Sequence, residues 1–251
     1  MIIEYLRPAG MDEAVRMLSR AGLTSKPLGG GTVLSKKALL EDFAVVDLQG
    51  TGLDTVVTAG DSFEVGAACT LQHLAEHGHV PTALQNAIER ETNLHMRNMA
   101  TVGGTVVSAD GCSPLLTAFL ALDATLVWQP GTRSIKLSDW LVGRNKSAQG
   151  VLIEKLMFSN DIQLKCKFLA RSPQDYPMAS LAFANLADGG MRIAAGMVRE
   201  GSPVVLYEGQ SAADGVKTAG TACSNLLSGS KYAKYLKSVV PAMIEQMLQE
   251  S

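Results

Sequence analysis

The sequence has 251 residues, of which 47% are hydrophobic, and a formal net charge of −2 from 22 basic and 24 acidic residues. A chain of this size buries a substantial core and divides into two or three subdomains. Its balanced charge provides no polybasic surface, so we expect neither nucleic acid nor an anionic membrane as a partner. No signal peptide and no apolar run of spanning length is visible, so we expect a cytoplasmic protein.

The first fifty residues predict a small α/β unit. Residues 11–21 carry apolar side chains at helical spacing, with acidic residues at the start and a glycine after the end. A short strand at 25–28, a glycine turn, a helical stretch at 34–40 and an apolar strand at 43–48 follow.

The next hundred residues predict a larger, mixed unit. Two β-rich runs at 55–58 and 62–66 flank Ala59-Gly60-Asp61, which indicates a hairpin. The remaining elements are expected as helices at 71–77, 82–91 and 114–122, a second glycine turn at 101–105 and a strand at 124–128.

From residue 151 the pattern becomes mainly extended and favours a sheet built from hairpins. Candidate strands cover 151–158, 164–170, 179–186 and 191–198. Apolar residues between 235 and 247 are spaced for the buried face of a terminal helix.

The potential metal ligands predict no metal site. Cys69, Cys112, Cys166 and Cys223 show no CxxC spacing, which suits reduced thiols and excludes the usual four-cysteine iron-sulfur cluster in this chain. The His73/His77 pair has helical spacing, but no carboxylate stands where a metalloprotease motif requires one. The end of a solvated helix explains these histidines better.

The most informative feature is a pair of glycine turns, at 28–32 and 101–105. Consecutive glycines can direct several backbone N–H groups toward one anion, although a Gly-Gly pair is more often only a turn. Neither turn ends in the Gly-Lys-[Ser/Thr] of a P-loop, and the first lacks the last glycine of a Rossmann fingerprint. What remains is a long ligand with a diphosphate, held by two separate turns.

Three segments carry a resemblance to a known family. Residues 26–34 (KPLGGGTVL), 97–104 (RNMATVGG) and 120–124 (LALDA) resemble the FAD-binding medium subunits of molybdenum hydroxylases, of the xanthine dehydrogenase and carbon monoxide dehydrogenase type. The spacing of Lys167, Arg171 and Asp175 and the run 228–232 are similar to motifs of the same family's C-terminal domain.

The resemblance implies an α+β fold. It consists of the two-subdomain FAD-binding module of vanillyl-alcohol oxidase type flavoproteins, at residues 1–52 and 53–160, followed by a C-terminal α+β domain with an antiparallel sheet at 161–251. It also implies FAD as the cofactor, and it assigns no catalytic side chain. The implied FAD contacts are Leu28, Gly29, Gly30, Gly31, Thr32, Val33, Leu34, Thr101, Gly103, Gly104, Thr105, Ser108, Asp110, Ser113 and Lys167.

Two positions depart from the family pattern. Thr105 replaces an asparagine that usually follows the two glycines, and Pro114 replaces an aspartate that faces the adenosine end of FAD. Proline offers no side-chain acceptor, so a polar contact is lost unless Asp110 moves in. Alternatively, Pro114 simply begins the following helix, where proline is favoured.

Three functions follow from these observations. The leading hypothesis is an electron-transfer subunit that passes electrons from a small [2Fe-2S] subunit through FAD to NAD or another acceptor, beside a large molybdopterin-binding subunit. The second is a docking subunit that keeps the fold but binds FAD weakly or not at all, which Pro114 motivates. A stand-alone flavin oxidase is the least favoured, because the chain lacks a substrate domain.

Overall fold

The computed structural model describes residues 1–34, 41–144, 150–173, 175–186, 188–198, 200–227 and 232–249. Contacts divide the chain into two compact units, each assembled from three separate segments. The first contains 1–78, 93–108 and 125–158, and the second contains 79–92, 109–124 and 159–251. The boundaries 1–52, 53–160 and 161–251 stay predictions. Most of the helical stretch at 34–40 and of the run 228–232 lies outside the described residues.

The first unit begins with a three-stranded parallel sheet. Its strands are β1 (Ile2–Leu6), β2 (Ser25–Leu28) and β3 (Phe43–Asp47), in the order β1-β3-β2. Every residue of β3 is buried, as its apolar run Phe43–Val46 requires of a central strand. Helix α1 (Met11–Ser19) buries Ala14 and Leu18 in a cluster with Val46 and Leu48.

A five-stranded sheet forms the rest of the first unit. Its strand order is β4-β5-β8-β6-β7, and the β4–β5, β6–β7 and β6–β8 pairs are antiparallel. The strands are β4 (Val56–Ala59), β5 (Ser62–Gly66), β6 (Thr125–Gln129), β7 (Arg133–Lys136) and β8 (Leu152–Ser159). Short helices α2 (Leu71–Glu76), α4 (Leu94–Arg97), α5 (Val102–Ser108) and α7 (Leu137–Val142) accompany it.

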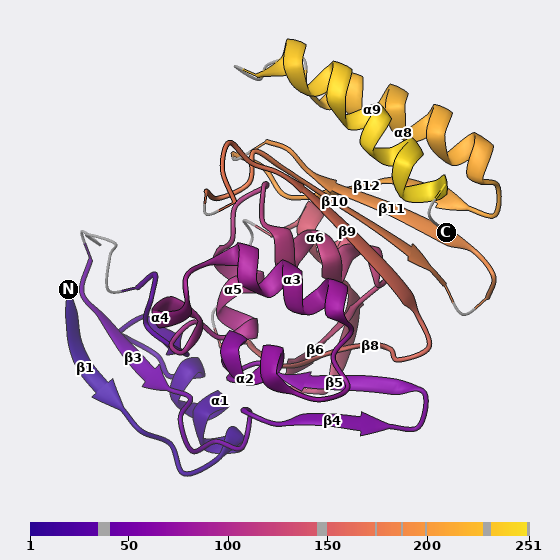
Figure 1. The fold of residues 1–251 in the computed structure, drawn as a ribbon. Coiled ribbons are helices and arrows are strands. Elements are labelled where there is room, and N and C mark those ends of the chain that lie inside the picture. The colour runs from indigo at the N-terminus through magenta and orange to yellow at the C-terminus, as the bar shows by residue number, and fades with distance from the viewer. Residues whose placement is uncertain are drawn as a thin grey trace. The chain divides into compact units, whose positions relative to one another are not determined.

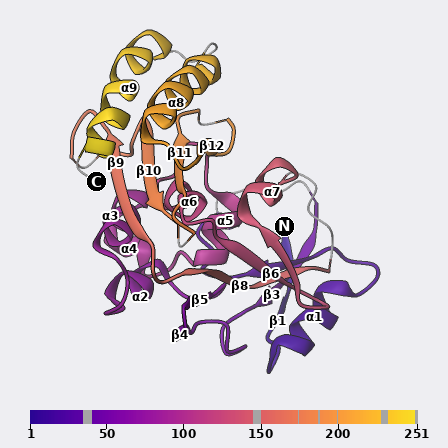
Figure 2. The same cartoon turned by 90° about the vertical axis from the view of Figure 1, so that its right-hand side faces the viewer.

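The second unit is built on a four-stranded antiparallel sheet with the order β12-β11-β10-β9. The strands are β9 (Gln163–Leu169), β10 (Ala179–Asn185), β11 (Met191–Gly196) and β12 (Val204–Gly209). Helices α8 (Ala212–Leu226) and α9 (Ala233–Gln249) cover one face, and α3 (Thr82–Glu91) and α6 (Pro114–Ala121) lie on the other (Figures 1 and 2).

Helix α6 is the centre of the second unit, because every one of its residues is buried. Ser113 caps its N-terminus by accepting the Leu116 N–H at 3.0 Å, and Pro114 occupies the first turn, where proline has no N–H to leave unpaired. The interpretation of Pro114 as a helix start is therefore confirmed. A helix buried on all sides must be almost entirely apolar, and the one polar side chain of α6, Thr117, donates its hydroxyl to the Ser113 carbonyl oxygen at 2.7 Å.

One buried arginine ties this helix to the sheet. Arg192 of β11 is 7% exposed and donates to Asp123 at 2.6 Å and to Glu208, its cross-strand neighbour, at 2.8 Å. A third, longer hydrogen bond reaches the Leu120 carbonyl oxygen at the end of α6. The guanidinium thus joins β11, β12 and the C-terminus of α6.

The structure confirms the α+β class and the antiparallel C-terminal sheet. Among the described residues, no helix is both long and apolar enough to cross a membrane. Strands β1, β7 and β12 and helices α4, α7 and α8 were not predicted from the sequence.

We expect Arg192→Ala to destabilise the chain by about 2–3 kcal/mol, because it removes a buried guanidinium that donates to Asp123, to Glu208 and to the end of α6. Chemical unfolding followed by circular dichroism measures this loss. Arg171→Ala is the matched control, because Arg171 forms only an exposed pair with Asp175 and its loss should cost less than about 0.5 kcal/mol. Equal effects of the two substitutions would contradict the assigned role of Arg192.

Candidate FAD-binding site

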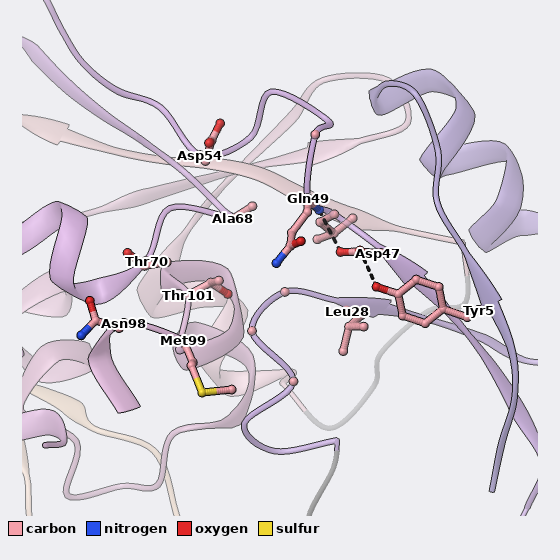
Figure 3. Close-up of a pocket in the computed structure, with 15 residues that line it drawn as sticks. Tyr5, Leu28, Asp47, Gln49, Asp54, Ala68, Thr70, Asn98, Met99 and Thr101 are labelled. Atoms are coloured by element: carbon pink, nitrogen blue, oxygen red, sulfur yellow. Dashed lines mark hydrogen bonds between the residues drawn. The ribbon is translucent and has the colours of Figure 1, made fainter. Parts of the chain in front are cut away.

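A cavity of about 440 Å³ opens in the first unit beside the first glycine turn (Figure 3). This volume is in the range typical of ligand pockets. Its walls come from the ends of β1, β2 and β3 and from the segments before α2 and α5. The lining residues are Tyr5, Leu28, Gly29, Gly30, Gly31, Asp47, Leu48, Gln49, Gly50, Asp54, Ala68, Thr70, Asn98, Met99 and Thr101.

The first glycine turn needs its glycines for two different reasons. Gly31 has a φ of +69°, a conformation that favours glycine. A Cβ at Gly30 would overlap the Met99 carbonyl oxygen, and one at Gly29 would come within 2.5 Å of Thr101 Oγ1. The turn is therefore packed directly against the segment 99–101, and no side chain fits between them.

The amide groups of Gly29 and Gly30 donate to no described residue. Both residues line the cavity. Unused backbone N–H groups at a concave surface are the feature that binds phosphate in many proteins. The first turn thus keeps the donors that the sequence analysis expected of it.

The second glycine turn is different, and the expectation of a turn with bare amide groups is wrong there. Gly103 and Gly104 lie in the first turn of α5. The N–H groups of residues 102–105 all donate within the first unit. Their acceptors are, in order, the carbonyl oxygens of Cys69 and Ala67, the Thr101 hydroxyl and the Thr101 carbonyl oxygen.

Close packing explains the glycine at position 103. A Cβ there would lie 2.9 Å from both the carbonyl oxygen and the Cβ of Ala67. Contacts of Gly103, Gly104 and Thr105 with FAD stay predictions, but their backbone N–H groups already have partners.

The predicted site residues divide into those that line this cavity and those that do not. Leu28, the three glycines after it and Thr101 lie at the cavity. Six others in the first unit, Thr32, Val33, Leu34, Gly103, Gly104 and Thr105, are not among its lining residues, and neither is Ser108, whose hydroxyl donates to Gly104 O at 2.7 Å. Asp110, Ser113 and Lys167 belong to the second unit.

Sequence reasoning missed the acidic side of the cavity. Asp47 ends strand β3 and is 1% exposed. Its carboxylate accepts the Tyr5 hydroxyl at 2.5 Å and the Gln49 N–H at 3.0 Å, and the Arg7 guanidinium lies 3.5 Å away. The hydrogen bond to Asp47 raises the pKa of Tyr5, so the phenol stays protonated as its donor. The sequence did offer one indication of this polar site, because Asp47 is a single aspartate at the end of an otherwise apolar strand.

Two polar residues on other sides of the cavity were also missed. Gln49 extends its side chain into the cavity in Figure 3. Thr70 precedes α2 and is joined to Thr101 by an isolated antiparallel bridge. The position of Thr70 just before a helical run indicated an N-cap residue. No local pattern in the sequence indicated that Thr70 lies beside Thr101.

In the second unit, the predicted contacts Asp110 and Ser113 are engaged in a polar cluster. Ser113 is 0% exposed, and its hydroxyl donates to Glu91 Oε2 at 2.7 Å. The same carboxylate oxygen accepts the Leu115 N–H at 3.1 Å. Asp110 accepts the Cys112 N–H and the Tyr176 hydroxyl, both at 2.9 Å. Their roles toward FAD stay predictions.

The Glu91 carboxyl of this cluster has a raised pKa. Burial raises its pKa to about 7, against the lowering effect of the Ser113 and Leu115 hydrogen bonds, and the nearby Asp110 charge raises it further. The carboxyl therefore changes charge near neutral pH at the N-terminus of α6.

Lys167 is a half-buried residue of β9, opposite Leu181 of β10 in the sheet register. Lysine on a strand is often only a solvated side chain, and the sheet position alone does not distinguish that from a flavin contact. Its assignment to FAD stays a prediction.

Comparison with known proteins identifies the family to which the chain belongs. A family model described as the FAD binding domain in molybdopterin dehydrogenase matches residues 1–158. The chain belongs to this family. The expected family, its FAD cofactor and the classification as an oxidoreductase component are thereby confirmed.

Relatives of the FAD-binding family agree with this result. The chain is 28% identical to Uncharacterized protein YgfM of Escherichia coli K12 over 195 residues, which are 77% of this chain and 74% of the relative. It is 31% identical to the carbon monoxide dehydrogenase medium chain of Afipia carboxidovorans over 151 residues, which are 56% of this chain and 52% of that one.

A solved structure shows the same fold. Quinoline 2-oxidoreductase from Pseudomonas putida 86 matches with a TM-score of 0.81 and 20% identity, covering 100% of this chain and 98% of the matched chain.

We expect Glu91→Gln to remove a pH-dependent loss of stability. Because the folded pKa of Glu91 is about 7 and its ordinary value is 4.5, stability is fully present below about pH 4.5 and is lost as the pH rises through 7. The glutamine variant stays neutral, and its amide oxygen can accept from Ser113 and Leu115. It should match the parent at pH 4.5 and exceed it by about 1–3 kcal/mol at pH 8.5.

Urea unfolding at both pH values measures this difference. The matched control is Glu245→Gln, because Glu245 is an exposed acid on α9. A Glu91 variant with the same pH profile as the parent would show that the carboxyl titrates in its ordinary range.

Proposed function

We propose that this chain is the electron-transfer subunit of a molybdenum-containing dehydrogenase and holds FAD with the cavity of its first unit. It receives electrons from [2Fe-2S] clusters of a small partner subunit and passes them to NAD or another acceptor. A large molybdopterin-binding partner oxidises the substrate. The name of the carbon monoxide dehydrogenase medium chain supports a place in a multi-subunit enzyme, since a medium chain implies a larger and a smaller one.

The glycine turn beside the cavity carries this proposal. The described residues fit a diphosphate there, because the Gly29 and Gly30 N–H groups have no partner among them. The first unit also contains most of the segment that matches the FAD-binding family. FAD supplies the redox chemistry of such a subunit, accepting electrons from one centre and releasing them to another.

The residues of this chain have the task of binding and orientation. The Gly29 and Gly30 amides hold the phosphate charge, and the close packing of their turn on Met99 fixes where those amides lie. Asp47, held by Tyr5 and Gln49, presents acceptors rather than donors. We therefore assign the acidic side of the cavity to hydroxyl or ring N–H groups of the cofactor, and the glycine side to its phosphates.

A second candidate function is a docking subunit that binds FAD weakly. Its support lies in the second unit, where Pro114 replaces the usual aspartate and is buried as the first residue of α6. Asp110 does not stand free to replace it, because its carboxylate accepts from Cys112 and Tyr176. The visible absorption spectrum of the chain after incubation with FAD distinguishes the two functions.

We expect the purified full-length chain, incubated with FAD and desalted, to retain the visible absorption bands of the flavin. Gly30→Ala should weaken FAD binding about 100-fold, because the added Cβ displaces the turn from Met99 and two hydrogen bonds to a charged group are lost. Flavin fluorescence titration measures the dissociation constants.

Gly78→Ala is the matched control. A Cβ there meets nothing within 4 Å, and its backbone is not in the left-handed region, so FAD binding should be unchanged. A parent chain that retains no flavin after reconstitution would favour the docking subunit instead.

A further inference from the structure

Two threonines that line the cavity, Thr70 and Thr101, are joined by an antiparallel bridge, and neither hydroxyl donates its proton to a described residue. Thr70 Oγ1 accepts the His73 N–H at 3.1 Å, and Thr101 Oγ1 accepts the Gly104 N–H at 3.2 Å. The described residues offer no acceptor to either hydroxyl. An oxygen that already accepts a backbone N–H is left with its own O–H to give, so both side chains act as donors toward a further group.

The position of this pair relative to the glycine turn indicates which group that is. A Cβ at Gly29 would come within 2.5 Å of Thr101 Oγ1, so the Thr101 hydroxyl lies directly against the turn that carries the Gly29 and Gly30 amides. The bridge between Thr70 and Thr101 places Thr70 beside Thr101, and all of these residues line the cavity (Figure 3). Backbone and hydroxyl donors therefore meet at one region of the cavity.

Four donors without an internal acceptor match an anion with several oxygens. The cavity also contains two carboxylates, Asp47 and Asp54, which repel an anion. An anionic ligand is therefore favoured only where the hydrogen-bond donors lie between it and these carboxylates. Gly29 and Gly30 donate from one segment, and Thr70 and Thr101 from two others. A diphosphate, with oxygens on two phosphorus atoms, is the part of FAD that uses donors from several directions.

We propose that Thr70 is a phosphate-binding residue of the FAD site and that its hydroxyl, together with that of Thr101, donates to the diphosphate held by Gly29 and Gly30. This inference rests on the proposed function, because it takes the cavity as the place of FAD. Sequence reasoning assigned Thr101 to FAD but gave no role to Thr70. Thr70 is half-buried, lines the cavity and is joined to Thr101 by the bridge.

The test separates the donor from the helix cap, since Thr70 performs both roles. Thr70→Asp keeps an oxygen that accepts the His73 N–H, removes the donor and adds a negative charge that a nearby diphosphate would be repelled by. Thr70→Val removes both, and Thr70→Ser keeps both. Ser211→Ala removes a comparable cap, at the start of α8, from a residue that does not line the cavity. It therefore measures what the loss of a cap does by itself.

The readouts are the dissociation constants of FAD and of riboflavin, which lacks the phosphates, together with thermal melting of each full-length variant. We expect Thr70→Val and Thr70→Asp to weaken FAD binding by about tenfold to hundredfold, and Thr70→Ser by less than about threefold. Riboflavin binding should change by less than about twofold in all of them. Only Thr70→Val and Ser211→Ala should lower the melting temperature.

Each outcome decides between the two proposals. If the parent chain binds FAD and Thr70→Asp binds it equally well, Thr70 is a helix cap only and this inference fails while the proposed function stands. An equal loss of FAD and riboflavin affinity would place Thr70 away from the phosphates and would also overturn it. If the parent binds neither ligand, the proposed function fails, and the inference fails with it.

Discussion

The packing of the first glycine turn against residues 99–101 is the contact on which the candidate site depends. It brings the end of a parallel strand to the start of a helix that belongs to a different sheet layer of the same unit. No side chain can separate the two segments, because a Cβ at Gly30 would occupy the space of the Met99 carbonyl oxygen. The two backbone segments are therefore in direct, close-packed contact, and the cavity opens beside this contact.

The same contact changes the meaning of the two glycine motifs. In the first motif the Gly29 and Gly30 amides donate to no described residue, whereas the amides of residues 102–105 in the second all donate inside the unit. The second motif therefore contributes shape, and it places the Thr101 side chain beside the first. A site of this kind is built by one donor segment and one segment that holds it in position.

The sequence predicted elements well where local pattern and tertiary packing agree. Strand β2 has the predicted bounds, and the apolar run of β3 made its burial evident. Gly103 and Gly104 were misread because glycine disfavours helices, whereas close packing on Ala67 admits only glycine there and overrides that preference. Edge strand β1 was missed because its pairing with β3 is distant in sequence and leaves three of its five residues exposed.

The site was only partly predictable for a related reason. Glycine turns are visible in a sequence because their spacing is local. Tyr5, Asp47 and Thr70 belong to the cavity only because three chain segments meet there. A residue whose role comes from such a meeting leaves no short motif, so family resemblance pointed to the turns and not to their polar neighbours.

The buried start of α6 has a consequence for how the sequence of this protein can change. Glu91 already brings a carboxylate to the Leu115 N–H, one residue beyond Pro114. An aspartate at 114 would introduce a second acid into the same confined space, and mutual repulsion would force one of the two to hold a proton. Positions 91 and 114 are thus coupled: an acid at 114 is best accommodated when the residue at 91 is neutral.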